Sequence, residues 1–487
     1  MCAYVKAFLR FSQLHARVLI VSLSLDLGKE VLGRALDRGA DEAVVRLQER
    51  VYELIVFDSG VLRSYSVSRA VGLGVEVLVG GFAGYAYTSA LSRDGVERAV
   101  ERALKLARAL SASGRGVRLA SVEGAKVLYR ALYSQNPLDV DPSEKTSLVR
   151  DLNRVAMGVE GVVSAVTRLA CELDRRVVVS SLGAEALSEV VAVGVSNLSV
   201  ARFGEVMERV GDQKTFIGGY ENVRSFDWSA FVEDISRLAT KASQAKTPPP
   251  GAYRAVVDNE LIGLLLHEAF GHATEGDLVM YRASVLCGRL GERVAGDLVT
   301  IVDDGLAEGG YPVAFDDEGV AKRRTVVVES GVLKSYLTNR QASHELGVEA
   351  SGNARAQDTT FKPIVRQTNF FMLPGDASVE ELFEGVSEGV YLRGRSAMGG
   401  QVDPAVGTFT FSIGPSYIIR GGEPVELVRG VAVSGNILET LMSVELVARD
   451  LLVIPSVFGG CGKDGQMVRV GFGGPHVRVS KIVVGGG

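Results

Sequence analysis

The segment KTPPPG, residues 246–251, divides this chain of 487 residues into two regions. Three consecutive prolines cannot continue a helix, because each lacks a backbone N–H, and they favour an extended, semi-rigid connector. We therefore predict two domains, an N-terminal one over residues 25–247 and a C-terminal one over residues 251–487. Residues 1–24 fit neither region and are interpreted as an N-terminal extension that need not belong to the folded protein.

Upstream of the connector, helical and strand patterns alternate. Residues 96–110 repeat apolar side chains at helical spacing, and shorter helical patterns cover residues 27–36, 143–155 and 227–245, the last with Asp227 as its N-cap. Short runs rich in Val and Tyr predict the strands of an antiparallel meander, separated by Gly, Ser or Asp turns. These runs are residues 43–47, 52–57, 61–67, 72–79 and 82–89.

Downstream of the connector, strand patterns dominate. A strand is predicted over residues 253–257, a helix opens at Asp258 or Asn259, and the chain from Val299 onward has mostly strand and turn signals. The predicted fold class is therefore α+β, with N-terminal helices on an antiparallel sheet and a C-terminal β-rich domain that carries one metal-binding helix.

The overall composition excludes several classes of function. Lys and Arg number 53 against 58 Asp and Glu, for a net charge of −5, so the chain lacks the basic surface that nucleic-acid binding requires. The longest uncharged runs, residues 77–92 and 404–419, are shorter than the ~20 apolar residues of a membrane helix. No cleavable leader pattern occurs in the first 25 residues, so a cytoplasmic location is expected.

The segment LLLHEAFGHATEGD, residues 264–277, contains two of the five histidines of the chain. In a regular α-helix, residues five apart point about 140° away from each other, so His267 and His272 reach one ion only if the helix ends or bulges between them. We expect Gly271 to permit this break, with His267 on the helix and His272 beyond it. The alternative is a pair of hydrogen-bonded core histidines, but an acid between them favours a metal site.

The third ligand is sought among the cysteines, because the other histidines lack a second ligand or acid nearby. Cys461 lies in FGGCGKDGQ, residues 458–466, where glycines allow close backbone approach and Lys463 is expected to favour the thiolate. The set His267, His272 and Cys461, with an open fourth position, is typical of catalytic zinc. The alternative for Cys461 is a small buried residue in a Gly-rich turn.

Glu268 follows the first of these histidines directly. A carboxylate in this position can accept a proton from a metal-activated water and pass it to the leaving amine. We therefore predict Glu268 to be the general base.

Two further motifs carry weaker signals. DDG at 303–305 and DDEG at 316–319 resemble acid-rich cation sites but do not fit a calcium loop, and we interpret them as solvated turns. In SGNARA, residues 351–356, Asn353 and Arg355 either orient a peptide carbonyl or carboxylate of a substrate, or belong to a loop held by its own hydrogen bonds.

Several motifs in order along the chain resemble the TldD/PmbA family of metalloproteases. They are HEAFGH at 267–272, EGD at 275–277, SGNARA at 351–356, PIVR at 363–366, TN at 368–369 and CGK at 461–463. The resemblance covers the chain from about residue 25. It implies two domains, a Zn²⁺ ion on the two histidines and the late cysteine, and cytoplasmic proteolysis of unfolded proteins or peptides. It also implies a dimer with a homologous metal-free subunit of the PmbA/TldE type, although a homodimer remains an alternative. Because all four site residues are present, the chain is similar to the catalytic TldD type.

Two other functions are compatible with the same residues. A zinc site of this composition also suits an amidohydrolase acting on small acylated substrates, and the depth of the site would distinguish it from a peptidase. A noncatalytic regulatory subunit would hold a four-coordinate structural metal, and Glu268 beside the ligand argues against that interpretation.

Overall fold

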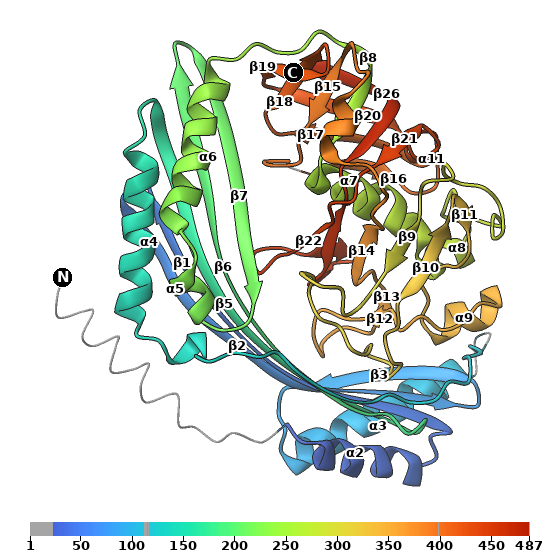
Figure 1. Cartoon of the computed structure of the whole chain (residues 1–487). Coiled ribbons are helices and arrows are strands. Elements are labelled where there is room, and N and C mark those ends of the chain that lie inside the picture. The colour runs from blue at the N-terminus through green and yellow to red at the C-terminus, as the bar shows by residue number, and fades with distance from the viewer. Residues whose placement is uncertain (1–22, 112–113, 115, 398, 487) are drawn as a thin grey trace.

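The computed structural model describes residues 23–111, 114, 116–397 and 399–486. Most of the predicted N-terminal extension, residues 1–22, lies outside this part of the chain. The described residues combine helices with five sheets (Figure 1), which confirms the predicted α+β class. Strands β1 to β7 form one sheet and strands β8 to β26 form the other four, so the predicted connector lies between the two groups.

The N-terminal region is one twisted sheet with helices on its outer face. Its helices are α2 (Leu25–Asp37), α3 (Arg93–Leu110), α4 (Pro142–Met157), α5 (Glu221–Ser225) and α6 (Trp228–Ser243). Its strands are β1 (Glu42–Asp58), β2 (Val61–Val79), β3 (Phe82–Thr88), β4 (Lys126–Arg130), β5 (Val162–Ser180), β6 (Glu185–Phe203) and β7 (Val206–Ile217). A 3₁₀ turn, Pro137–Asp139, precedes α4. The strand order is β3-β2-β1-β5-β6-β4, and β7 also pairs with β6.

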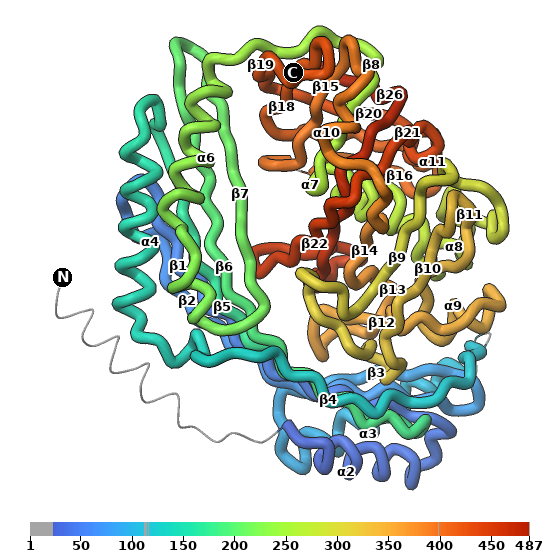
Figure 2. Tube along the Cα trace, in the orientation of Figure 1, coloured from blue at the N-terminus to red at the C-terminus, as the bar shows by residue number. Residues whose placement is uncertain are grey.

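The helices cover the two ends of this sheet. Helices α2 and α3 pack on one end and α4 and α6 on the other, both on the face turned away from the C-terminal region (Figure 1). The four helices predicted from the sequence are confirmed, and Asp227 caps α6 by accepting a hydrogen bond from the N–H of Ala230. The opposite, concave face of the sheet faces the C-terminal region (Figure 2).

The central strands are longer than predicted. Residues 43–47 and 52–57 lie in one strand, β1, and residues 61–67 and 72–79 lie in another, β2. The expected turns are absent because cross-strand partners satisfy the polar residues between these runs: the Gln48 amide donates to Asp174 at 2.8 Å. Gly72 marks close packing rather than a turn, since a Cβ there would lie 2.2 Å from the Oγ1 of Thr359.

The C-terminal region is built from short strands and short helices. Its helices are α7 (Asn259–Leu265), α8 (Gly276–Met280), α9 (Arg340–Leu346), α10 (Val379–Phe383) and α11 (Ile437–Met442). The strands of its nine-stranded sheet are β8 (Gly251–Val257), β15 (Glu388–Leu392), β16 (Gly400–Asp403), β17 (Thr408–Ile413), β18 (Ser416–Arg420), β19 (Glu423–Val428), β20 (Val431–Asn436), β21 (Val444–Val447) and β26 (Val477–Gly486). The six-stranded sheet contains β9 (Ile301–Asp303), β10 (Thr325–Glu329), β11 (Val332–Leu333), β14 (Asn369–Met372), β22 (Leu452–Pro455) and β25 (Gly471–Gly474). Two hairpins complete the region, β12 (Ala354–Arg355) with β13 (Ile364–Val365), and β23 (Cys461–Lys463) with β24 (Gln466–Val468).

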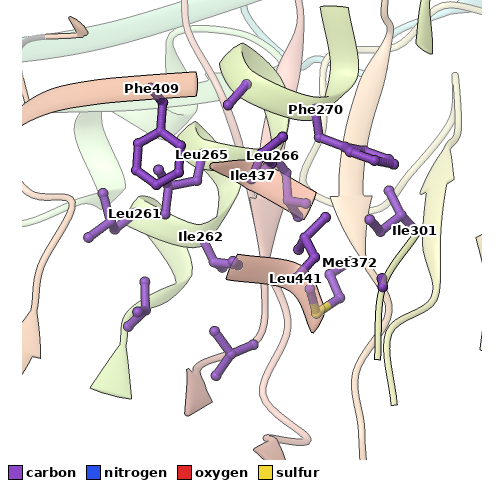
Figure 3. Packing of buried hydrophobic residues seen from close by; sticks show 14 of the residues in the cluster. Leu261, Ile262, Leu265, Leu266, Phe270, Ile301, Met372, Phe409, Ile437 and Leu441 are labelled. Atoms are coloured by element: carbon purple, nitrogen blue, oxygen red, sulfur yellow. The ribbon is translucent and has the colours of Figure 1, made fainter. Parts of the chain in front are cut away.

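The core of the C-terminal region surrounds the helix that follows β8. Strand β8 lies between β26 and β15 and leads into α7. The apolar side of α7 and of the residues after it is packed between the two large sheets (Figure 3), with the following side chains in contact: Leu261, Ile262, Leu265, Leu266, Phe270, Ile301, Met372, Phe409, Ile437 and Leu441. This packing fixes the helix that carries the histidines.

The prediction of solvated turns at the two acidic motifs is wrong for three of the aspartates. Asp303, Asp316 and Asp317 are all buried. Asp303 forms an ion pair with the buried Lys322 at 2.9 Å, and Asp316 accepts a hydrogen bond from the N–H of Ala354 at 3.0 Å. An Asp-Gly motif shows where the chain turns, whereas burial depends on partners from distant segments.

Within the ranges that the structure describes, no helix is both long and apolar enough to cross a membrane.

Candidate metal centre

Helix α7 begins at a well-defined N-cap. The carboxylate of Asp258 accepts a hydrogen bond from the N–H of Leu261 at 2.9 Å, which satisfies one of the free donors of the first turn. This confirms the predicted start of the helix. The cap and the buried apolar face together fix the position of the chain as it reaches His267.

A π-helical segment, Leu266–Gly271, follows α7 directly and explains the spacing of the two histidines. A π-turn contains one residue more than an α-turn, so residues five apart lie on nearly the same face. The two imidazole ring centroids are 5.5 Å apart. The sequence prediction that the helix ends or bulges between the two histidines is thus confirmed, because the π-helical segment is a bulge and ends at Gly271. Gly271 and His272 both keep right-handed helical angles, and His272 opens a 3₁₀ turn, His272–Thr274.

Gly271 is required by packing rather than by backbone freedom. A Cβ at this position would lie 2.2 Å from the Oε1 and 2.5 Å from the Cδ of Gln367. The Nε2 of Gln367 donates to the carbonyl of His267 at 3.0 Å, within the widened turn. Gln367 therefore supports the π-helical segment. This residue was not predicted from the sequence, although it stands between two of the quoted motifs.

Cys461 is brought to the histidines by the β23–β24 hairpin. Its Sγ lies 3.3 Å from the Nε2 of His272, although 189 residues separate them in the sequence. The side chain is buried, and the buried guanidinium of Arg366 donates to the carbonyl of Cys461. The hairpin and Arg366 together hold the sulfur against the π-helical segment.

A second set of charged residues orients His272. Its Nδ1 lies 3.0 Å from the Oε2 of the fully buried Glu275, which leaves Nε2 directed at Cys461. The ammonium of Lys463 pairs with Glu275 at 2.9 Å and with Asp277 at 2.7 Å. The expectation that Lys463 favours the thiolate stays a prediction, and its ammonium is held by the two carboxylates behind the histidine.

The ionisation of these groups follows from their neighbours. Burial alone would raise the pKa of Cys461, but His267 and His272 outweigh burial and hold the pKa of the thiol well below its usual value. Burial also opposes the charge of Glu275, yet His272 and Lys463 lower the pKa of its carboxyl to about 2. Burial opposes the charge of both histidines, but Cys461 beside His267 and Glu275 beside His272 raise their pKa values. The site therefore favours a thiolate next to charged histidines, with an ionised carboxylate behind one of them.

The three side chains fit a zinc ion. Their candidate ligand atoms all lie within 4.8 Å of one another. In a tetrahedral zinc site a sulfur and a nitrogen ligand are roughly 3.5 Å apart, close to the 3.3 Å between Cys461 and His272. The Nδ1 of His267 is buried and has no hydrogen-bond partner among the described residues. Buried polar atoms rarely lack partners, so the cluster is incomplete without a bound group.

Glu268 lies at the open side of this cluster. Its side chain is 35% exposed, whereas His267 and His272 are buried, and its Oε2 is 4.0 Å from the Nε2 of His272. The carboxylate is therefore close to the candidate ligands and accessible from outside.

Asn353 and Arg355 lie in the protein interior, away from this opening. The amide of Asn353 donates to Asp303 and to the carbonyl of Arg366, each at 2.8 Å. The guanidinium of Arg355 donates to the carbonyls of Gln367 at 2.6 Å and Arg469 at 2.7 Å. These contacts place both residues in the framework behind the site and give no support to direct substrate binding.

Comparisons with known proteins match almost the whole described chain. Three family profiles align in order, described as PmbA/TldA metallopeptidase domain 1 (residues 43–107), central domain (135–244) and C-terminal domain (250–486). A metalloprotease of Methanothermobacter thermautotrophicus is 38% identical over 441 residues, covering 89% of this chain and 92% of that protein. A zinc metalloprotease TldD homolog of Saccharolobus solfataricus is 33% identical and covers 72% of this chain and 78% of its own length. The crystal structure of TldE from Thermococcus kodakarensis has the same fold, with a TM-score of 0.75 at 18% identity over 94% of this chain and all of that one.

Proposed function

This chain belongs to the PmbA/TldD family of metallopeptidases, and we propose that it is a zinc-dependent peptidase that cleaves peptide bonds in unfolded proteins or peptides. The single observation that carries the proposal is the convergence of Cys461 on the histidine pair, with Glu268 at the open side. The thiol and the imidazoles come from distant segments, and one buried nitrogen among them has no hydrogen-bond partner in the part of the chain that the structure describes.

His267, His272 and Cys461 would hold the zinc ion. When bound there, zinc supplies a Lewis acid that polarises a carbonyl and makes water a better nucleophile at neutral pH. Glu275 keeps the Nδ1 of His272 engaged and so presents its Nε2, which is the usual role of a carboxylate behind a ligand histidine.

Glu268 would carry the proton. Its carboxylate takes a proton from the attacking water and delivers it to the leaving amine, so one side chain acts first as base and then as acid. The partial exposure of Glu268 fits this role, because the carboxylate must meet both water and substrate.

An extended peptide fits the surroundings better than a small acylated amine. Within the described sheets, β7 pairs only with β6 and β22 only with β25, so each has one free edge. A cavity of about 570 Å³ lies between these two strands, and a free strand edge can hold a peptide backbone by strand addition. The size of this cavity, beside two free strand edges, supports the peptidase over the amidohydrolase.

The partner of this chain is proposed to be a homologous metal-free subunit of the TldE type, with a second copy of the chain as the alternative. The shared fold with the TldE of Thermococcus kodakarensis is compatible with such a pair. Light scattering of the chain alone and mixed with a metal-free homologue distinguishes the two assemblies.

The proposed function is tested by separating zinc content from turnover. The purified protein should contain about one zinc per chain and hydrolyse labelled unfolded casein. Glu268→Gln should keep the zinc and lower kcat/KM by ~10²–10⁴. Glu345→Gln removes an exposed charge elsewhere in the same region and should change neither quantity. Near-normal turnover in Glu268→Gln would exclude the base role, and turnover of formylated or acylated amines without peptide cleavage would favour the amidohydrolase.

A further inference from the structure

A groove runs between the concave side of the N-terminal sheet and the C-terminal region, beside the metal centre. It consists of two cavities of about 570 and 410 Å³. Both are lined by Asp212, Gln213, Glu260 and Ile454, so they meet at these residues. The smaller cavity is also lined by Phe472, whose ring centroid lies 6.2 Å from that of His267. The groove therefore leads from Glu260 towards the candidate metal ligands.

One face of the histidine-bearing helix forms the floor of this groove. Among residues 258–272, the three that are not buried are Glu260, Leu264 and Glu268. A spacing of four residues places side chains on the same face of a helix. This face offers Glu260 and Leu264 to the groove, and the proposed general base Glu268 follows on the same helix just beyond the two cavities.

Glu260 differs from the other acids of the groove because its carboxylate has no hydrogen bond or ion pair with the described residues. Asp212 pairs with Arg395 at 2.8 Å, and Asp258 is used as the N-cap of α7. Burial first, and then the negative charges of Asp212 and Asp258, raise the pKa of Glu260 to about 8, and Arg395 and Arg393 only partly offset them. Among the described residues, its carboxylate is therefore left without a directly paired cation.

The cations in the walls of the groove do not supply this charge. Lys214 in the larger cavity lies over the rings of Phe216 and Phe226, with its ammonium 5.7 and 5.9 Å from the two centroids. Arg168 and Arg209 in the smaller cavity are exposed. A positive group that enters the groove would therefore find Glu260 available.

We propose that Glu260 binds a positively charged group of the peptide substrate, three or four residues from the bond that is cut. The distance follows from the helix, since eight residues at about 1.5 Å each separate Glu260 and Glu268 by up to about 12 Å along its axis, and somewhat less where the turn widens after Leu265. An extended peptide covers about 12 Å with three or four residues. Leu264 then contacts a side chain between the two points. The inference rests on the proposed peptidase function and adds a preference for basic substrates to it.

The test measures binding rather than cleavage. N-acetylated fluorescent octapeptides carry one lysine at successive positions, each matched to a peptide with the neutral isostere norleucine there. A third set has a free amino terminus and no lysine. Dissociation constants are measured by anisotropy at pH 8.5, where the Glu260 carboxylate is charged, on the full chain carrying Glu268→Gln so that no peptide is consumed.

One lysine position should bind about tenfold more tightly than its norleucine counterpart, and Glu260→Gln should abolish the difference. Glu233→Gln, which removes an exposed acid paired with Arg237 on α6, should preserve it. If only the peptides with a free amino terminus bind more tightly, the inference is also supported, and the terminal amine is then the positive group that Glu260 binds.

Equal affinities for lysine and norleucine at every position, or a lysine preference that survives Glu260→Gln, would overturn it. Because binding is measured in a cleavage-deficient chain, a failure of the proposed peptidase function appears separately, as absent hydrolysis by the unsubstituted protein.

Discussion

Two buried polar clusters of the C-terminal region differ in how completely their atoms are satisfied. Around Asp303, both carboxylate oxygens accept hydrogen bonds from Thr368, Asn353 or Lys322, and the ammonium of Lys322 also reaches the carbonyl of Ser351. At the metal centre, a buried nitrogen of His267 has no partner among the described residues. A saturated cluster, in which every polar atom has a hydrogen-bond partner, stabilises the fold. An unsaturated cluster has a polar atom left free to contact a ligand.

Removing a member of the unsaturated cluster should abolish zinc binding and leave the fold intact. In Cys461→Ala we expect zinc to fall from about one per chain to nearly none, because three protein ligands leave no redundancy. The unfolding free energy of the metal-free protein should change by about 1 kcal/mol or less. Elemental analysis and urea denaturation in a chelator measure the two effects. Unchanged zinc would contradict the assignment of Cys461 as a ligand.

Removing a member of the saturated cluster should do the opposite. Asp303→Ala leaves Lys322 buried without a counter-charge and should lower the unfolding free energy by about 3–5 kcal/mol. The remaining folded protein should still bind zinc. Asp304→Ala is the matched control, because its partner Arg324 is exposed, and it should cost about 1 kcal/mol or less. Equal destabilisation by the two substitutions would remove the distinction between the clusters.

The smallest loss of unfolding free energy should arise at Gly271 and Gln367, where side-chain packing supports the π-helical segment. Gly271→Ala forces the buried Gln367 aside and should cost about 1–3 kcal/mol of unfolding free energy. Gln367→Ala alone should cost a similar amount, since it leaves the carbonyl of His267 unsatisfied. The two losses should not add in the double variant, because the steric conflict disappears with the side chain. Strict additivity in denaturant melts would show that Gly271 is needed for another reason.

The site could be predicted from the sequence where rare residue types coincide, and not where its geometry depends on distant partners. Residue type and sequence context were enough to predict four residues of the site: His267, Glu268, His272 and Cys461. The need for a bulge between the histidines could also be predicted, but its π-helical form could not, because that form is supported by Gln367, which lies 100 residues away. The same limit applies to Asp303, whose Asp-Gly context indicated a solvated turn while Lys322 and Asn353 bury it.

For the fold as well, features with local sequence signals could be predicted and features that depend on distant contacts could not. Helix boundaries such as Asp227 and Asp258 were predictable, because a cap and an apolar face are local signals. Strands β1 and β2 were divided wrongly, because a polar residue such as Gln48 and a glycine such as Gly72 look like turns unless their cross-strand or packing neighbours are known.

The separation of the cysteine from the histidines also constrains how the protein is made. Translation from His272 to Cys461, 189 positions later, takes about 10 to 40 s at ordinary elongation rates. Strand β26 then has to insert between β20 and β8, the strand that leads into the histidine-bearing helix. The ligand set is therefore incomplete throughout most of biosynthesis. On the proposed peptidase function, the order in which the residues appear would delay activity until the chain is nearly complete.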